Sequence, residues 1–217
     1  MGLTFAGALD RSAVIDAVAA IGVLVRAPEV AAAWTQESAL PGMSVGGLAR
    51  HLVSQPECAV EFLGLAVPAG APTLDLLAYA DTLDWLDAPV DAPENTSIRE
   101  DFDEMASAGP AEATAGYEAA LDALPAALAA SGPVTFVPWQ GVALSTDDFL
   151  VMRLLEIAVH ADDLAVSVGL PARELPEAAI QPVIALLGAL ALRRHAQSDV
   201  IRALARAERS PNAVSAF

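Results

Sequence analysis

The strongest constraint on the fold is the spacing of apolar residues, which recur at three- and four-residue intervals along most of the chain. This spacing is typical of helices that bury one face. Divided at Pro, Gly and polar capping residues, the pattern predicts helices at 10–27, 44–65, 73–83, 97 onward, 110–130, 146–168 and 174–208. Strand spacing is found only at 134–144, where two apolar runs flank a Pro-Trp-Gln-Gly turn.

The fold class that follows is an all-α helical bundle with one small β-hairpin. We expect a single domain over residues 1–217, with a core bundle at about 8–168 and a C-terminal helical extension at about 172–208. Two prolines, Pro56 and Pro182, are expected to kink or interrupt their helices. Five helix starts carry capping signals: Asp10, Ser44, Thr73, Ser97 with Glu100, and Ser145 with Asp148.

The charge balance and hydropathy exclude several classes of partner. The chain has 28 acidic and 11 basic residues, and its net charge of -17 repels phosphate backbones, so nucleic-acid binding is not expected. The acidic tract 81–104 is interpreted as a solvated face. The longest apolar run, Val183 to Leu192, is about half the roughly 20 residues that span a bilayer. With no secretory leader pattern at the start, we expect a cytoplasmic protein that is not membrane-bound.

A narrow polar stripe marks the predicted helix 146–168. Arg153, Glu156, His160 and Asp163 fall on one face within an arc of roughly 80° at about 100° per residue, while apolar residues fill most of the remainder. One interpretation is a helix that exposes this strip to water, with ordinary pairing between Glu156 and His160. The other is a metal site, because a carboxylate and an imidazole one turn apart point the same way and can bind one ion.

A third metal ligand would have to come from another helix, and His51 is the natural candidate. It is one of only 3 histidines and lies on a mostly apolar face, although a lone His there is often an ordinary core residue. His/Glu/His ligation leaves coordination positions open, so such a site should face a pocket. Asp163 would orient a ligand imidazole, and Arg153 would neutralise Glu156 or hold a substrate anion.

Other candidate residues have plainer interpretations. The single cysteine, Cys58, rules out a CxxC metal knuckle; it lies seven residues after His51, and a buried apolar side chain is favoured over a reactive or ligating thiol. His195, among arginines near a helix end, is expected to be solvated.

Two segments resemble the mycothiol-dependent maleylpyruvate isomerase family, part of the DinB/YfiT-like superfamily of metal-binding four-helix bundles. In the segment 34–52, Leu40-Pro41-Gly42 is followed nine residues later by His51. The segment 153–164 reads R-x-x-E-x-x-x-H-x-x-D-L. The predicted hairpin and the Arg-rich ending are also similar to family members, so the resemblance covers most of the chain.

The resemblance implies a divalent metal, zinc or else nickel or another divalent ion, on His51, Glu156 and His160. It also implies mycothiol, a thiol of actinobacteria, as cosubstrate, and an S-transferase or cis-trans isomerase activity on a small electrophile, with Trp34 at the pocket wall. A homodimer is a further expectation. Met43 stands where the family commonly has Trp, and no second domain is expected after the last helix, so specificity for maleylpyruvate is not implied. The alternative is a non-catalytic metal-binding bundle that binds a small molecule or partner.

Overall fold

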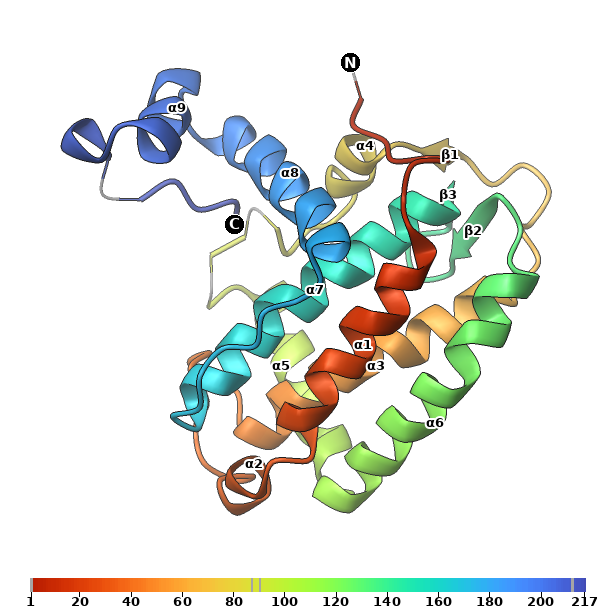
Figure 1. Ribbon diagram of the computed structural model, residues 1–217, viewed down its shortest axis with the longest axis vertical. Helices are drawn as coiled ribbons and strands as arrows, with labels where there is room; N and C mark the ends of the chain where they lie inside the picture. The colour runs from red at the N-terminus through yellow and green to blue at the C-terminus, as the bar shows by residue number, and fades with distance from the viewer. Residues whose placement is uncertain (1, 87, 90, 212) are drawn as a thin grey trace.

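Four long helices form the centre of the molecule. The computed structural model describes residues 2–86, 88–89, 91–211 and 213–217. Helices α1 (Arg11–Val25), α3 (Val45–Leu63), α6 (Pro110–Ala130) and α7 (Thr146–Ser167) lie side by side (Figure 1). Helix α3 packs against α6 and α7, and α1 packs against the same two helices. Their facing sides supply most of the fully buried apolar core, which confirms the predicted helical bundle.

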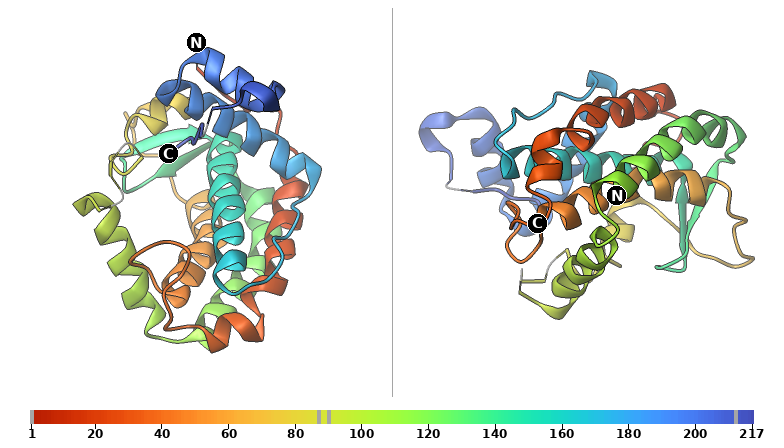
Figure 2. Two further views of the ribbon diagram at one scale, coloured as in Figure 1. Left: turned by 90° about the vertical axis from the view of Figure 1, so that its left-hand side faces the viewer. Right: turned by 90° about the horizontal axis from the view of Figure 1, so that it is seen from below.

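The remaining helices cover the bundle from outside. Helix α5 (Pro93–Ala106) packs against α3 and stands apart from the other long helices (Figure 2), whereas α8 (Glu177–Arg194) packs against α7. The short elements are α2 (Pro28–Ala32), α4 (Leu76–Ala80), α9 (Gln197–Ala205) and a 3₁₀ turn at Ala207–Arg209. Within the described residues, none of these helices has the length and apolar character needed to cross a bilayer.

A small sheet lies at the end of the bundle where α7 begins (Figure 1). Strands β2 (Val134–Val137) and β3 (Val142–Ser145) form the predicted antiparallel hairpin, and the turn between them uses Gly141 at a φ of 65°. The sequence analysis missed a third strand, β1 (Thr73–Leu74), which pairs in parallel with β3. The resulting strand order is β1-β3-β2.

Three of the predicted capped helix starts are confirmed and two are wrong. The Asp10 carboxylate accepts a hydrogen bond from the Ser12 amide at the start of α1. The hydroxyl oxygens of Ser44 and Ser145 accept hydrogen bonds from backbone amides at the starts of α3 and α7. Thr73 lies in β1 instead, and Asp75 caps the short helix that follows. Helix α5 begins at Pro93, four residues before Ser97, because proline already has the φ angle of a first helical residue.

Neither Pro56 nor Pro182 divides its helix. Helix α3 continues through Pro56, and the carbonyl of His51 in the preceding turn accepts hydrogen bonds from the side chains of Ser54 and Gln55. These bonds satisfy an acceptor in the turn that the proline disturbs. Helix α8 likewise continues through Pro182, and the break in the C-terminal helices falls at His195.

Two buried carboxylates at the start of α7 hold the N-terminal segment against the bundle. Asp148, which is only 1% exposed, accepts hydrogen bonds from the Phe5 amide (2.6 Å) and the Thr4 hydroxyl (2.8 Å). Asp147 accepts from the Gly7 amide and from Arg11, each at 2.7 Å. The Ser145 half of the predicted capping box is therefore formed, while the Asp148 side chain has this long-range role.

Replacing Asp148 with alanine should lower the free energy of unfolding by at least about 2 kcal/mol, since hydrogen bonds to a buried charged group are lost and their donors are left without a partner. Urea denaturation followed by circular dichroism measures the change. Asp162→Ala, an exposed site on the same helix, is the matched control. Equal stability of the two variants would contradict a clamping role for Asp148.

Candidate metal centre

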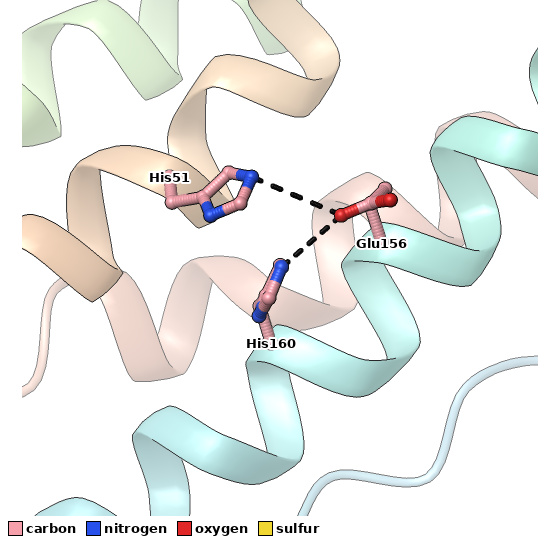
Figure 3. A group of neighbouring side chains, drawn as sticks. All are labelled: His51, Glu156 and His160. Carbon is pink, nitrogen blue, oxygen red and sulfur yellow. Dashed lines mark hydrogen bonds and ion pairs between the residues drawn. The ribbon is translucent and has the colours of Figure 1, made fainter. Parts of the chain in front are cut away.

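Side chains from α3 and α7 converge at one point in the bundle (Figure 3). The Oε2 atom of Glu156 lies 3.1 Å from Nε2 of His160 and 3.8 Å from Nε2 of His51. One potential ligand atom from each of the three residues lies within 4.8 Å of the others. The two imidazole rings are tilted against each other, with centroids 4.2 Å apart. The structure thus brings together the three residues that the sequence analysis had grouped.

The spacing and chemistry of these atoms fit a divalent ion. Imidazole nitrogen and carboxylate oxygen bind zinc at about 2.0–2.2 Å, so two ligands of one ion can be at most about 4.2 to 4.4 Å apart. The two distances from Glu156 fall below that limit. The same oxygen faces both histidines, so a single ion between them could be bound by all three side chains.

The polar stripe of α7 faces the protein interior rather than water. Arg153 is 7% exposed and Glu156 8%, and the side chain of His160 is 12% exposed. The interpretation of the stripe as a solvent-exposed strip is therefore wrong, because α3 covers this face of α7. A buried polar cluster must satisfy its own hydrogen bonds and charges, or bind something that does.

The environment sets different protonation states for the two histidines. Burial, assisted by the nearby His160, lowers the pKa of His51 to about 3, so this ring is neutral near pH 7. Burial alone would lower the pKa of His160 too, yet hydrogen bonds to Asp163 and Glu156 raise it to about 9. Burial opposes ionisation of Glu156, but its hydrogen bond to His160 and the surrounding positive charges keep the pKa of this carboxyl low.

These pKa values predict that metal binding releases one proton. At about pH 7.5 only His160 has to lose a proton to become a ligand, so close to one proton should leave per ion bound. Since the pKa of His160 is raised, metal affinity should increase as the pH rises toward 9 and level off above it. Calorimetric titration in buffers of different ionisation enthalpy counts the protons. Two histidines of ordinary pKa would together release only about 0.2 proton per ion bound at this pH. A measured release of that size would contradict these assignments.

Asp163 contacts the outer nitrogen of His160. Its Oδ2 atom lies 3.2 Å from Nδ1 of His160, while Nε2 of the same ring faces Glu156. A carboxylate in this position fixes the orientation of the ring and makes it a better ligand. This contact agrees with the role suggested for Asp163 from the sequence.

Changing Asp163 to asparagine should weaken metal binding by about 10- to 100-fold without abolishing it, because all three ligand side chains remain. Competition with a fluorescent zinc chelator measures the affinity. Asp162→Asn, the adjacent exposed carboxylate, should bind metal like the wild type. If the two variants bind equally well, Asp163 does not support His160.

Arg153 lies on the same face but does not pair with Glu156. Its Nη1 donates a hydrogen bond to Oε1 of Gln55 at 2.7 Å, and no ion pair joins the guanidinium to a carboxylate among the described residues. Arg153 therefore acts on Glu156 without direct contact, and its positive charge contributes to the low pKa of that carboxyl. Gln55 in turn donates to the His51 carbonyl at 2.9 Å, so it links Arg153 to the helical turn that carries His51.

Phe102 from α5 is a neighbour of the site that the sequence analysis missed. Its ring stacks on His51 with centroids 4.2 Å apart and planes 13° apart. The only sequence signal was one aromatic residue within an acidic segment. Trp34, the expected pocket wall, packs against Gly46 and donates to the Ala106 carbonyl at 2.9 Å, which anchors the end of α5.

The remaining candidates lie outside the cluster. Cys58 is partly buried, and burial raises the pKa of its thiol, which agrees with an unreactive side chain. His195 is at the end of α8, with Nε2 2.8 Å from the Ser215 carbonyl. In the acidic tract, Asp103 accepts a hydrogen bond from the amide of Ser44 at 3.0 Å, and Asp87 lies outside the described residues.

A hollow of the surface lies on the side of α7 that faces away from the three candidate ligands. It has a volume of about 490 Å³ and is lined by Ala158 and Asp162 of α7 and by residues 172–175, Glu177 and Ile180. Ala158 and Asp162 point away from Glu156 and His160, because they lie on the opposite side of the helix. The side chains of the three ligands are between 10% and 17% exposed, so access to them from solvent is narrow.

Comparison with known proteins identifies the family of this chain. Residues 14–165 match the family model described as the mycothiol maleylpyruvate isomerase N-terminal domain. The match covers well over half of the chain, from within α1 to near the end of α7, and includes all three residues of the cluster. No curated protein and no solved structure gives a significant match.

Proposed function

This chain belongs to the mycothiol maleylpyruvate isomerase N-terminal domain family, and on that premise we propose that it is a metal-dependent thiol S-transferase or cis-trans isomerase. It would use mycothiol on a small electrophilic substrate. The observation that supports this most is the convergence of His51, Glu156 and His160 within a segment that the family match covers. We propose zinc as the metal, with nickel or another divalent ion as the substitute.

The protein side chains would prepare a binding site for the ion. His51 is neutral near pH 7, Glu156 is ionised, and Asp163 orients His160 through its outer nitrogen. Three protein ligands leave open coordination positions, which is typical of catalytic rather than structural sites. A divalent ion bound there would lower the pKa of a thiol and so supply the thiolate, the nucleophilic form.

The reaction follows from the chemistry of a thiolate and an activated double bond. The sulfur forms a bond to the electron-poor carbon, and the electron pair of the double bond moves onto the conjugated carbonyl. Rotation about the new single bond, followed by departure of the sulfur, restores the double bond as the other isomer. If a proton is taken up at the adjacent carbon instead, the thiol conjugate remains. Burial of the site would limit competing attack by water.

The second candidate function is a non-catalytic metal-binding bundle that binds a small molecule or a partner. It is favoured by the narrow access to the three ligands and by the position of the large hollow on the other side of α7. A site that holds an ion without admitting a substrate would have these properties.

The two candidates are separated by incubating metal-loaded protein with mycothiol and either monochlorobimane or maleylpyruvate. The enzyme proposal predicts conjugate formation or isomerisation above the background of His51→Ala. His195→Ala, which removes the histidine at the end of α8, should be as active as the wild type. No turnover above His51→Ala with any substrate of a wider panel of electrophiles would favour the non-catalytic bundle. Lack of stoichiometric metal after reconstitution with zinc or nickel would overturn both.

A further inference from the structure

The side chain of Arg153 is a buried cation without a counterion among the described residues. It is 7% exposed, and its one protein hydrogen bond runs from Nη1 to Gln55. Its Nε atom is buried and has no hydrogen-bond partner. All other buried side-chain nitrogen and oxygen atoms of the described residues have such a partner. Burying an ionised group without a partner is costly, and such groups are normally paired.

Other buried charges of the described residues have protein partners: two of them are in ion pairs, and Asp148 accepts hydrogen bonds from two neutral donors. Arg50, which is 9% exposed, contacts Glu57 at 2.9 Å, and Asp147, which is 5% exposed, contacts Arg11 at 2.7 Å. Arg50, the other buried arginine of the described residues, thus has a carboxylate partner. Arg153 lacks one although acidic residues outnumber basic residues by more than two to one in the sequence. A structural role alone does not account for this.

The surroundings hold the guanidinium in place while leaving one edge unbonded. Its central carbon lies 5.6 Å from the centre of the Phe149 ring and 5.9 Å from that of Trp139, within the range of cation-π attraction. Gln55 occupies Nη1 and is itself tied to the His51 carbonyl. The edge formed by Nε and Nη2 makes no protein hydrogen bond among the described residues, and its two parallel N–H groups match the two oxygens of a carboxylate.

The position of this edge relates it to the candidate metal centre. Arg153 lies three residues before Glu156 on the same face of α7, and Gln55 connects it to the turn that carries His51. We infer that the Nε–Nη2 edge of Arg153 binds a carboxylate of the substrate, so that Arg153 is the residue that selects electrophiles carrying this group. This inference rests on the proposed function for the identity of the substrate, whereas the anion site itself does not require a metal.

Fluorine NMR of protein labelled with 5-fluorotryptophan tests the anion site without turnover. Trp139 lies beside Arg153, and Trp139→Phe assigns its signal among those of the three tryptophans. The probe is benzoate, with benzamide as a neutral molecule of nearly the same shape. Benzoate should shift the Trp139 signal in a saturable way and benzamide should not. Arg153→Gln should weaken benzoate binding at least about tenfold, since charge-assisted hydrogen bonds are lost.

Controls separate this inference from the metal proposal. Arg50→Gln removes a buried arginine that is already paired and should bind benzoate like the wild type. His51→Ala should retain benzoate binding, even if its metal is lost. Arg153→Lys keeps the charge but lacks the two parallel N–H groups, so it should bind benzoate with intermediate affinity. This variant still tests the inference if Arg153→Gln fails to fold. Benzoate binding that is unchanged in both Arg153 variants, lost in His51→Ala, or absent from the wild type would overturn the inference.

Discussion

Replacing His51 with alanine is expected to remove metal binding almost completely and, with it, the proposed thiol chemistry. His51 is the only candidate ligand from α3, so its loss leaves two ligands on one helix. Removing a residue that merely orients a ligand costs about 10- to 100-fold in affinity, and removing a ligand should cost more than that. Zinc content after dialysis and turnover with mycothiol measure the two effects.

The comparison needs variants that keep the fold. The ring of His51 packs against Phe102, so alanine also removes a packing contact. His51→Gln fills more of that space without providing an imidazole, and circular dichroism checks the helices of both variants. His195→Ala removes a histidine at the end of α8 and should keep the full metal content. Stoichiometric zinc in both His51 variants would contradict the assignment of this residue as a ligand.

The second large effect is stabilisation of the fold by added zinc. The metal-free site confines Glu156 and a protonated His160 in a buried position. An ion that binds only the folded chain stabilises it by about 4 kcal/mol when its free concentration is 1,000 times Kd. For a chain of this size, the corresponding increase in Tm is roughly 8 to 16 °C. Differential scanning calorimetry with increasing zinc measures the shift.

The stabilisation should depend on the three ligands together. Glu156→Gln keeps the size of the side chain but loses its charge, and its Tm should change little with zinc. Asp162→Asn, on the exposed side of α7, should respond like the wild type. A zinc-dependent shift of the same size in Glu156→Gln would place the ion elsewhere on the protein.

The sequence allowed prediction of those features that depend on neighbours along the chain. The common direction of Glu156 and His160 follows from their one-turn spacing, whatever packs against α7. Helix α6 has the predicted bounds because Pro110 opens it and Ser131-Gly132 follows its end. The hairpin was recognisable because its turn carries Pro and Gly between two apolar runs.

Features that depend on long-range packing could not be predicted in this way. Thr73 had the local properties of a helix cap, but pairing of β1 with the distant β3 placed it in a strand. No local pattern specifies that α5 packs on α3 and brings Phe102 onto His51. His51 itself was grouped with the residues of α7 through the scarcity of histidine and the family resemblance, and the packing of α3 on α7 brings them together.

Burial of the polar stripe is the difference with the largest functional consequence. Helical periodicity placed Arg153, Glu156 and His160 on one face but could not distinguish a face covered by α3 from one open to water. In a buried face, the unbonded edge of Arg153 and the Glu156 oxygen that faces both histidines indicate binding sites for a ligand.

Anomalous X-ray diffraction at the zinc absorption edge, from crystals of protein purified without a histidine tag and reconstituted with zinc, tests the central claim most directly. We expect one strong anomalous peak within bonding distance of His51, Glu156 and His160. No peak at this position, or full occupancy only at another site, would contradict the assignment of these three residues as the metal centre.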